Sequence, residues 1–295
     1  YLIGCYLSEG SIIYRNNRPA ALSFDISDSE VDTFGEKIIN ACKKISNNFE
    51  PKIYRKRANG NSASIRYTNH ELANYLYNNC SGNSKNKKIS EYLFNQLNEK
   101  NIYTMIGAFI DGDGYQNHSA RPGCTRIDIA SPYLASQLKL LLNSVNIRVS
   151  YLKKQQKGGP NNREQECDIY CLGIPAADLK QMSKYSQKIT EFSNNREFKG
   201  YWTERGLSQP ITDIQEKHYV GKVYNLEVED DNSYIANGIS VHNCEHLKSR
   251  KGKKFSGVID KGKRKGEKVQ NELVYEDNHD LKFIELSIVS DGAFA

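Results

Sequence analysis

The sequence predicts an α+β fold built from two copies of an αββαββα unit, followed by a short all-β segment. Two stretches with the same residue pattern, residues 2–10 and 106–114, open two regions in which the expected helices and strands follow in the same order. Residues 222–242 then alternate in the manner of strands, without a helical period. We therefore divide the 295-residue chain into residues 1–100, 101–205, 206–243 and 244–295.

The second of the paired stretches, residues 106–114, reads IGAFIDGDG. Its apolar residues have the spacing of one helix face, and small residues are interleaved with them. Because small residues on a helix suit a second backbone that comes very close, we expect a tightly packed helix. Gly114 is expected to end it as a left-handed C-cap. Asp113 is unfavourable at the negative end of the helix dipole unless a cation binds there.

The first stretch, residues 2–10, reads LIGCYLSEG and also ends in an acid and a glycine, Glu9 and Gly10. Two such helices packed together place Glu9 beside Asp113. A pair of carboxylates is costly unless a divalent metal lies between them. The sequence therefore predicts that Glu9 and Asp113 form a metal site.

The first half continues with strands, a long helix, a second strand pair and a short helix. Turn-forming residues separate the strands of each pair. The expected strands are residues 11–14, 20–26, 52–57 and 62–68, and the expected helices are residues 28–45 and 70–78.

The second half repeats this order, and residues 187–192 mirror residues 87–92. Two copies of this length indicate a pseudo-dimer within one chain rather than a solenoid. The expected strands are residues 126–130, 149–154 and 168–173, and the expected helices are residues 131–145 and 176–185.

Positive charge is concentrated in the region with the paired helices. Residues 1–209 hold 28 Lys and Arg against 20 Asp and Glu, within a chain of net charge +6. Basic residues on strands can neutralise phosphates and pair with guanine edges, which favours a double-stranded DNA partner. The candidate DNA-binding residues are Arg15, Arg18, Lys52, Arg55, Arg57, Arg66, Arg126, Lys153 and Lys154.

The paired stretches resemble the LAGLIDADG homing endonucleases. Gly4, Glu9 and Gly10 match the motif in the first copy. Asp111, Asp113 and Gly114 match it in the second. The resemblance implies a monomer with internal pseudo-two-fold symmetry that cleaves both DNA strands at a long recognition site. It implies that the terminal acids hold Mg²⁺ (or Mn²⁺).

The resemblance also implies a catalytic lysine near residues 87–92. The family's spacing favours Lys87, whereas the internal repeat favours Lys88, which aligns with Lys188. All three lysines are candidates, because an ammonium group near the metals stabilises negative charge on the reacting phosphate or orients a water molecule.

Residues 223–244, VYNLEVEDDNSYIANGISVHNC, resemble the C-terminal splicing blocks of inteins, which belong to the Hint domain. The Asn243 side chain can attack its own carbonyl carbon and cut the chain, and His242 can transfer the protons. Cys244 can receive the upstream segment on its thiol. Asn225 and Asn232 depart from the family pattern, which often has Asp and His at these places.

The resemblance implies a missing N-terminal intein segment as an intramolecular partner, and it makes residues 244–295 the start of the downstream host protein. We therefore expect a fragment of a longer chain, limited to cleavage after Asn243. Two other interpretations stay open. In the first, the chain is a non-cleaving, maturase-like nucleic-acid-binding module. In the second, it is a splicing-only remnant.

The composition indicates the cellular location of the protein. No run approaches the ~20 apolar residues of a membrane span, and no signal peptide is apparent. The seven cysteines are scattered, without the spacing of a disulfide framework. These features predict a cytoplasmic, reducing location and no membrane partner.

Overall fold

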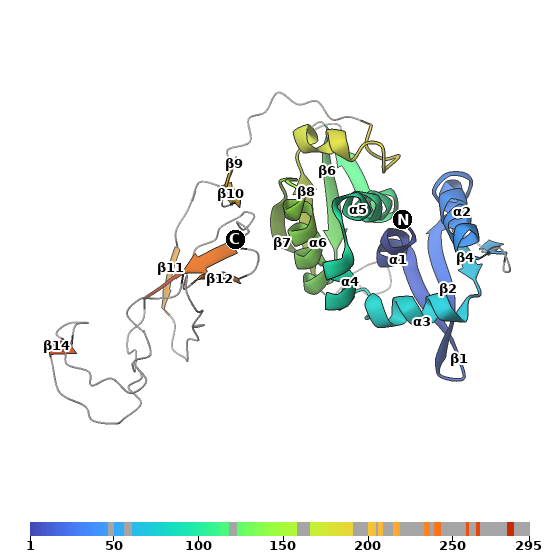
Figure 1. The fold of residues 1–295 in the computed structure, drawn as a ribbon, viewed down its shortest axis with the longest axis horizontal. Coiled ribbons are helices and arrows are strands. Elements are labelled where there is room, and N and C mark those ends of the chain that lie inside the picture. Colours follow the sequence, from blue (N-terminus) through green and yellow to red (C-terminus); the bar gives the residue numbers. More distant parts are fainter. Residues whose placement is uncertain are drawn as a thin grey trace.

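The computed structural model describes residues 1–46, 50–55, 61–117, 123–157, 166–190, 200–204 and 206–208, with six short strands between residues 215 and 285. The architecture is mixed α and β, with antiparallel sheets (Figure 1). None of the helices in these ranges has the length and hydrophobicity that a bilayer crossing requires.

The first half forms a four-stranded antiparallel sheet in the order β1-β2-β4-β3. Asn16 and Asn17 connect the first two strands with φ of 49° and 59°, the left-handed conformation that a tight hairpin turn needs. The strands are β1 (Gly10–Arg15), β2 (Arg18–Ser27), β3 (Lys52–Arg55) and β4 (Ser62–Tyr67).

The long helix expected over residues 28–45 is not continuous. It begins as a 3₁₀ turn (Asp28–Glu30), continues as a π-helical turn (Val31–Gly35) and becomes regular only in α2 (Glu36–Ile45). A capping box between Ser27 and Glu30 tightens the first turn. The prediction of one regular helix was therefore wrong at its N-terminal end, whereas α3 (His70–Asn79) lies where residues 70–78 were expected.

The second half forms a sheet with the corresponding order, β5-β6-β8-β7. Its strands are β5 (Gly114–Asn117), β6 (Cys124–Ile129), β7 (Ser150–Lys157) and β8 (Glu166–Ile174). Helices α4 (Glu91–Gln96) and α5 (Glu99–Asp113) precede this sheet, and α6 (Pro132–Ser144) packs against β6 and β8.

The short helix expected over residues 176–185 is a 3₁₀ helix over Ala176–Gln181, so the expectation of a regular helix was wrong. Asp178 in this segment binds Arg148 through the main-chain amide and the guanidinium group, at 2.6 to 2.8 Å. This tertiary contact fixes the first turn, which an isolated short helix could not stabilise by itself.

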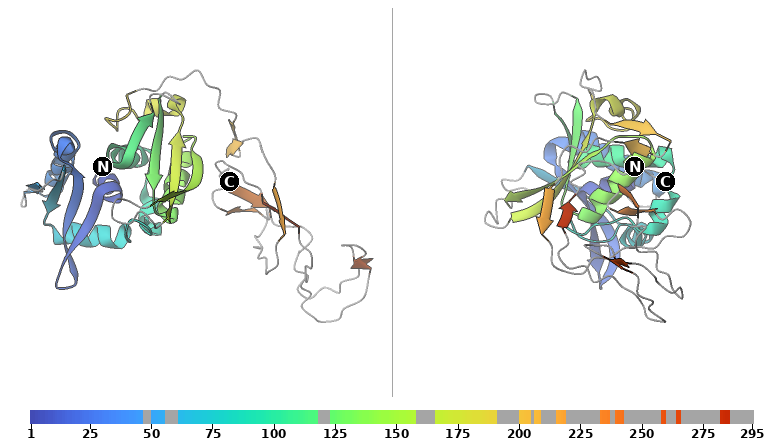
Figure 2. Two further views of the ribbon diagram at one scale, coloured as in Figure 1. Left: turned by 180° about the vertical axis from the view of Figure 1, so that it is seen from behind. Right: turned by 90° about the vertical axis from the view of Figure 1, so that its left-hand side faces the viewer.

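Helices α1 (Leu2–Glu9) and α5 lie side by side at the centre of the two halves, with one sheet on each side of the pair (Figures 1 and 2). A Cβ atom on Gly4 would overlap the Met105 carbonyl oxygen and lie 2.8 Å from Ala108 Cβ. A Cβ atom on Gly112 would lie 2.8 Å from Ser8 Cβ. The interleaved small residues therefore permit the close approach that the sequence predicted.

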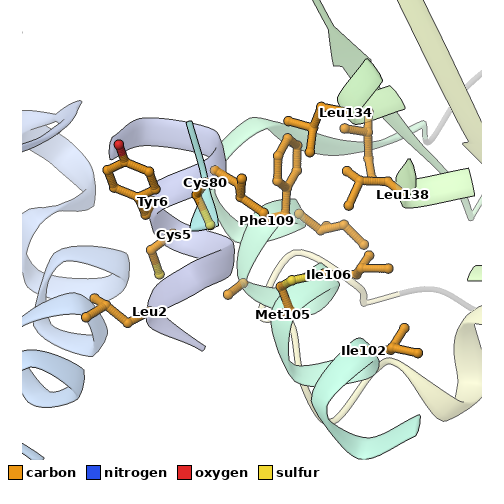
Figure 3. Close-up of a cluster of buried hydrophobic side chains, with 14 of the residues drawn as sticks. Leu2, Cys5, Tyr6, Cys80, Ile102, Met105, Ile106, Phe109, Leu134 and Leu138 are labelled. Atoms are coloured by element: carbon orange, nitrogen blue, oxygen red, sulfur yellow. The ribbon is translucent and has the colours of Figure 1, made fainter. Parts of the chain in front are cut away.

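Apolar side chains fill the space on both sides of the helix pair. Leu2 and Cys5 of α1 face the first half, whereas Ile106 and Phe109 of α5 lie toward α6 (Figure 3). The two halves thus share one continuous hydrophobic core, and this core fixes the positions of both helix ends.

Gly10 and Gly114 are not left-handed caps. Their φ angles are −89° and −84°, in the extended region, so the predicted left-handed conformation of Gly114 was wrong. Each glycine instead lets the chain fold straight from the helix into a strand. A Cβ atom on Gly10 would lie 2.6 Å from the Tyr6 carbonyl oxygen, and one on Gly114 would lie 2.7 Å from Ile110 Cα.

The later part of the chain is described as short strands. β9 (Tyr201–Thr203) pairs with β10 (Gly206–Ser208), and β14 (Val258–Ile259) pairs with β15 (Arg264–Lys265). β12 (Ser233–Ala236) and β13 (Ile239–His242) form an antiparallel pair within residues 222–242, which the sequence predicted to form strands. β11 (Gln215–His218) pairs with β16 (Lys282–Glu285). Residues 222–229, the first part of the region predicted to form strands, lie outside the described residues.

We expect Gly4→Ala to destabilise the protein by about 1–3 kcal/mol, because the added methyl group meets main-chain atoms of α5 that cannot rotate away. The midpoint of thermal unfolding should therefore fall by several degrees. Gly35→Ala is the matched control. Its Cβ would lie 3.0 Å from Ile26 Cδ1, the end of a flexible side chain, and its φ of −59° suits alanine. Equal losses from both substitutions would contradict this account of helix packing.

Candidate active site

The carboxyl groups of Glu9 and Asp113 meet at the ends of α1 and α5. A Cβ atom on Gly112 would lie 3.2 Å from Glu9 Cγ, which shows how closely the two ends approach. Burial raises the pKa of Glu9 to about 7, with further contributions from the negative charges of Asp113 and Glu30. Partial burial also raises the pKa of Asp113, although a hydrogen bond from Glu9 and two nearby lysines oppose the rise.

The donor set of this pair fits a hard divalent cation. Within the ranges that the structure describes, no group of three or more His, Cys, Asp or Glu side chains forms a metal cage. Mg²⁺ does not need such a cage, since it usually keeps several waters and takes one or two carboxylates from the protein. Glu9 and Asp113 would supply those two carboxylates, and a cation would remove the repulsion that raises the pKa of Glu9.

A lysine lies at each helix end. Lys87 is buried, and its ammonium group donates hydrogen bonds to the carbonyl oxygens of Tyr6, Leu7 and Gly10 at 3.0, 3.2 and 3.0 Å. Lys188 donates to the Gly112 carbonyl oxygen at 2.7 Å at the end of α5. Burial lowers the pKa of Lys87, while the acids Asp113 and Glu9 raise it.

Lys88 is exposed, so Lys87 is the spatial counterpart of Lys188. The sequence repeat aligned Lys88 with Lys188 instead. That alignment was misleading, because Lys87 stands two residues before Ile89 whereas Lys188 directly precedes Ile189. The loops reach the helix ends along paths that differ by one residue, which only the tertiary structure reveals.

Asp111 matches the motif of the second stretch, but we predicted no role for it at the site. Its side chain is fully buried and accepts hydrogen bonds from the segment that carries Lys188. The available signal was an acid in the middle of the apolar part of a helix, where a carboxylate is found only if it is paired.

Six of the predicted DNA-binding residues lie on the open faces of the sheets, which we define as the faces opposite the buried core residues Ile65 and Ile127. Strand register places Lys52 directly opposite Arg66, whose guanidinium group lies 4.6 Å from the centre of the Tyr54 ring. On the second sheet, Asp128 pairs with two basic side chains at 2.7 and 3.4 Å. The six residues are Arg15, Arg18, Lys52, Arg66, Arg126 and Lys154.

Two predicted DNA-binding residues are on the opposite faces. Arg55 lies in register with the core residue Ala63 and pairs with Asp28 at 3.1 Å. Lys153 follows the parity of the core face and pairs with Asp168 at 2.9 Å. Because successive strand residues alternate faces, these two side chains cannot join their neighbours on the open faces. Arg57 lies outside the described residues.

The predicted splicing residues are mostly beyond the described part of the chain. The structure describes only the main chain of His242, the last residue of β13, which lies opposite Ser233. Asn243 and Cys244 lie outside the described residues, as do Asn225 and Asn232.

Curated proteins with different names contain a segment similar to this chain. The ATP-dependent DNA helicase Hel308 of Thermococcus kodakarensis is 30% identical over 250 residues, which are 82% of this chain and 21% of the helicase. The SufBD family protein Rv1461 of Mycobacterium tuberculosis is 26% identical over 247 residues, or 82% of this chain and 27% of that protein. A DNA polymerase of Thermococcus litoralis is 25% identical over 79% of this chain and 14% of the polymerase.

This chain therefore spans less than a third of each of these relatives. No family model matches it. Similar solved structures include I-DmoI in complex with DNA and Mn, at 13% identity and a TM-score of 0.43 over 63% of this chain and 93% of that one. The homing endonuclease I-WcaI bound to its DNA recognition sequence has 17% identity and a TM-score of 0.39 over 63% and 78%.

We expect Glu9→Gln to raise the midpoint of thermal unfolding at about pH 8 in EDTA. The pKa of Glu9 in the folded chain, about 7, lies above its ordinary value of 4.5, so folding loses stability as pH rises between these values. Gln carries no charge to bury. The increase in the unfolding midpoint should be smaller at about pH 5, because at that pH the raised pKa of Glu9 costs the folded chain less stability.

Added Mg²⁺ should raise the midpoint of the original chain at about pH 8 but raise that of Glu9→Gln much less, because only the carboxylate binds the cation well. Glu71→Gln, at an exposed site in α3, is the control and should respond to Mg²⁺ like the original chain. A gain from Glu9→Gln that is the same at both pH values would refute the proposed burial cost.

Proposed function

We propose that the first two parts of the chain, residues 1–205, act as a site-specific double-strand DNA endonuclease of the LAGLIDADG type. One observation carries this proposal. Two closely packed helices deliver Glu9 and Asp113 to a single point, and each helix end is held by a lysine ammonium group. Paired acids and lysines flanked by two basic sheets suit the hydrolysis of a polyanion.

Each group has a distinct task in the proposed reaction. Glu9 and Asp113 would hold Mg²⁺ (or Mn²⁺), which when bound supplies charge neutralisation and a more acidic water at the phosphodiester. Lys87 and Lys188 place positive charge at the two helix ends, where it stabilises negative charge that develops on the phosphate. One acid from each half suits a duplex, whose two strands are related by two-fold symmetry.

The open faces of the two sheets would bind the duplex. Their basic side chains neutralise phosphates, and Arg66 and Arg126 can also pair with guanine. Arg66 lies over Tyr54 and Arg126 is bound by Asp128, so both guanidinium groups are held in defined orientations before DNA arrives. A fixed orientation reduces the entropy that binding costs.

The second part of the proposal is that this endonuclease is carried in an intein. A helicase, a SufBD family protein and a DNA polymerase each contain a similar segment, which is a minor share of their length. A segment common to proteins with such different names is best explained as an inserted element. The resemblance of residues 223–244 to C-terminal splicing blocks supports the same interpretation.

In this interpretation Asn243 cyclises. Its side-chain nitrogen attacks its own main-chain carbonyl carbon, and the peptide bond to Cys244 breaks. His242 is placed in sequence to donate a proton to the leaving amine. In a complete intein, the thiol of Cys244 would receive the upstream segment by transesterification before Asn243 breaks this peptide bond.

We expect the chain with Mg²⁺ to linearise a plasmid that carries the uninterrupted host gene. Asp113→Asn should lower the single-turnover cleavage rate by at least about 10²-fold, because the metal loses a charged ligand. Its DNA dissociation constant should change only a few-fold. Glu71→Gln, at an exposed site in α3, is the control variant. Binding without cleavage by the original chain would favour the non-cleaving, maturase-like module.

We expect the full chain to release a fragment of residues 244–295 on prolonged incubation, and Asn243→Ala to abolish the release, because alanine has no nucleophilic amide. Mass spectrometry should find a succinimide at the new C-terminus. Asn237→Ala, between β12 and β13 in the sequence, is a control for the loss of an asparagine. Release that persists in Asn243→Ala would exclude the splicing role of this residue.

A further inference from the structure

We propose that Asp111 is a positioning residue, which holds the segment before Lys188 so that the lysine ammonium group stays at the end of α5. The proposal rests on the endonuclease function proposed above. Asp111 is fully buried within a helix, although a buried carboxylate costs several kcal/mol unless hydrogen bonds and counter-charges compensate. The structure supplies both kinds of partner, and they come from three different elements.

One carboxylate oxygen of Asp111 organises the lysine segment. Oδ1 accepts hydrogen bonds from the Ser186 hydroxyl at 2.6 Å, the Gln187 amide at 2.8 Å and the Lys188 amide at 3.4 Å. Ser186 is itself buried, and its oxygen also accepts from the Lys188 amide at 3.2 Å. Three consecutive residues are thus tied to one atom of α5.

The other oxygen ties this arrangement to the first half. Oδ2 accepts from the Lys37 ammonium group of α2 at 3.2 Å and from the Tyr1 hydroxyl at 3.3 Å. The Lys37 side chain is 41% exposed whereas Asp111 is fully buried, so the ion pair runs from the surface inward. Charge-assisted bonds of this kind are strong and directional, which makes the carboxylate a rigid junction between the halves.

The fixed main chain of this segment determines where the Lys188 ammonium group lies. With its main chain fixed, the side chain reaches the Gly112 carbonyl oxygen at 2.7 Å and Glu30 at 3.4 Å. Gly112 directly precedes Asp113, so Lys188 also lowers the pKa of Asp113. A shift of the segment by about 1 Å would weaken these contacts and slow a reaction that depends on them.

The first half holds its own lysine segment through different contacts. Leu7 occupies the place in α1 that Asp111 has in α5, and a leucine cannot hold a loop by hydrogen bonds. The Lys87 segment is instead bound by α6 and its cap. The Ser131 hydroxyl donates to the Lys87 carbonyl oxygen at 2.6 Å, and the Gln137 amide group pairs with the main chain of Ile89 at 2.7 and 2.8 Å. Loss of Asp111 should therefore release one lysine segment and spare the other.

Amide hydrogen exchange of the full chain tests the positioning directly and needs no cleavage activity. Asp111→Ala should accelerate exchange at the Gln187 and Lys188 amides by at least about tenfold, since their acceptor is removed. The Ile89 amide, which donates to Gln137, is the internal control and should keep its rate. Unchanged exchange at Gln187, or equal acceleration in both segments, would overturn the proposal.

If Asp111→Ala does not fold, Ser186→Ala carries the test. It removes the 2.6 Å bond and the second acceptor of the Lys188 amide while Asp111 stays in place. Exchange at the Lys188 amide should then rise several-fold relative to Ile89, and no rise would overturn the proposal.

A double-mutant cycle tests whether Asp111 acts through Lys188. Asp111→Ala and Lys188→Met should each lower the single-turnover cleavage rate by about tenfold or more without changing the DNA dissociation constant. The double variant should be no slower than Lys188→Met alone. If the two single substitutions instead lower the cleavage rate of the double variant by the product of their effects, Asp111 does not act through Lys188. If the original chain binds DNA but does not cleave it, the endonuclease function is refuted. Amide hydrogen exchange would then still test the positioning role of Asp111.

Discussion

The close approach of α1 and α5 is the constraint on which the rest of the structure depends. Gly4 faces the Met105 carbonyl oxygen with no room for a methyl group, so the two helix axes have one available separation. This contact also fixes where the helices end, and it brings Glu9 and Asp113 together whatever the cost in charge repulsion. Because packing forces the two acids together and the protein alone cannot separate them, we propose a cation as their counter-charge.

The helix ends show how stability and chemistry use the same groups. A helix leaves its last carbonyl oxygens without partners, and a left-handed glycine commonly satisfies them. Here Gly10 and Gly114 are extended, since each chain must enter a strand at once. Lys87 and Lys188 bind carbonyl oxygens there instead. They counter the negative end of each helix dipole and also keep positive charge beside the acids.

Patterns that depend on neighbouring residues were readable from the sequence, whereas those that depend on tertiary contacts were not. The core strands and the helices α1, α3, α5 and α6 lie where the apolar period indicated. The sheet faces of Arg55 and Lys153 depend on strand register, whereas the capping box between Ser27 and Glu30 is a local signal that we did not use. Asp111 escaped prediction because its partners are mostly far away in the chain.

The two halves share their strand order, but their contributions to the site are unequal. The Lys87 ammonium group makes three bonds to carbonyl oxygens and is buried, whereas Lys188 is shared between Gly112 and the acid Glu30. Burial raises the pKa of both acids, and the nearby charge of Glu30 adds to the rise at Glu9. A shared strand order does not impose symmetry on the charges, because a few differences such as Leu7 in place of an acid alter one half alone.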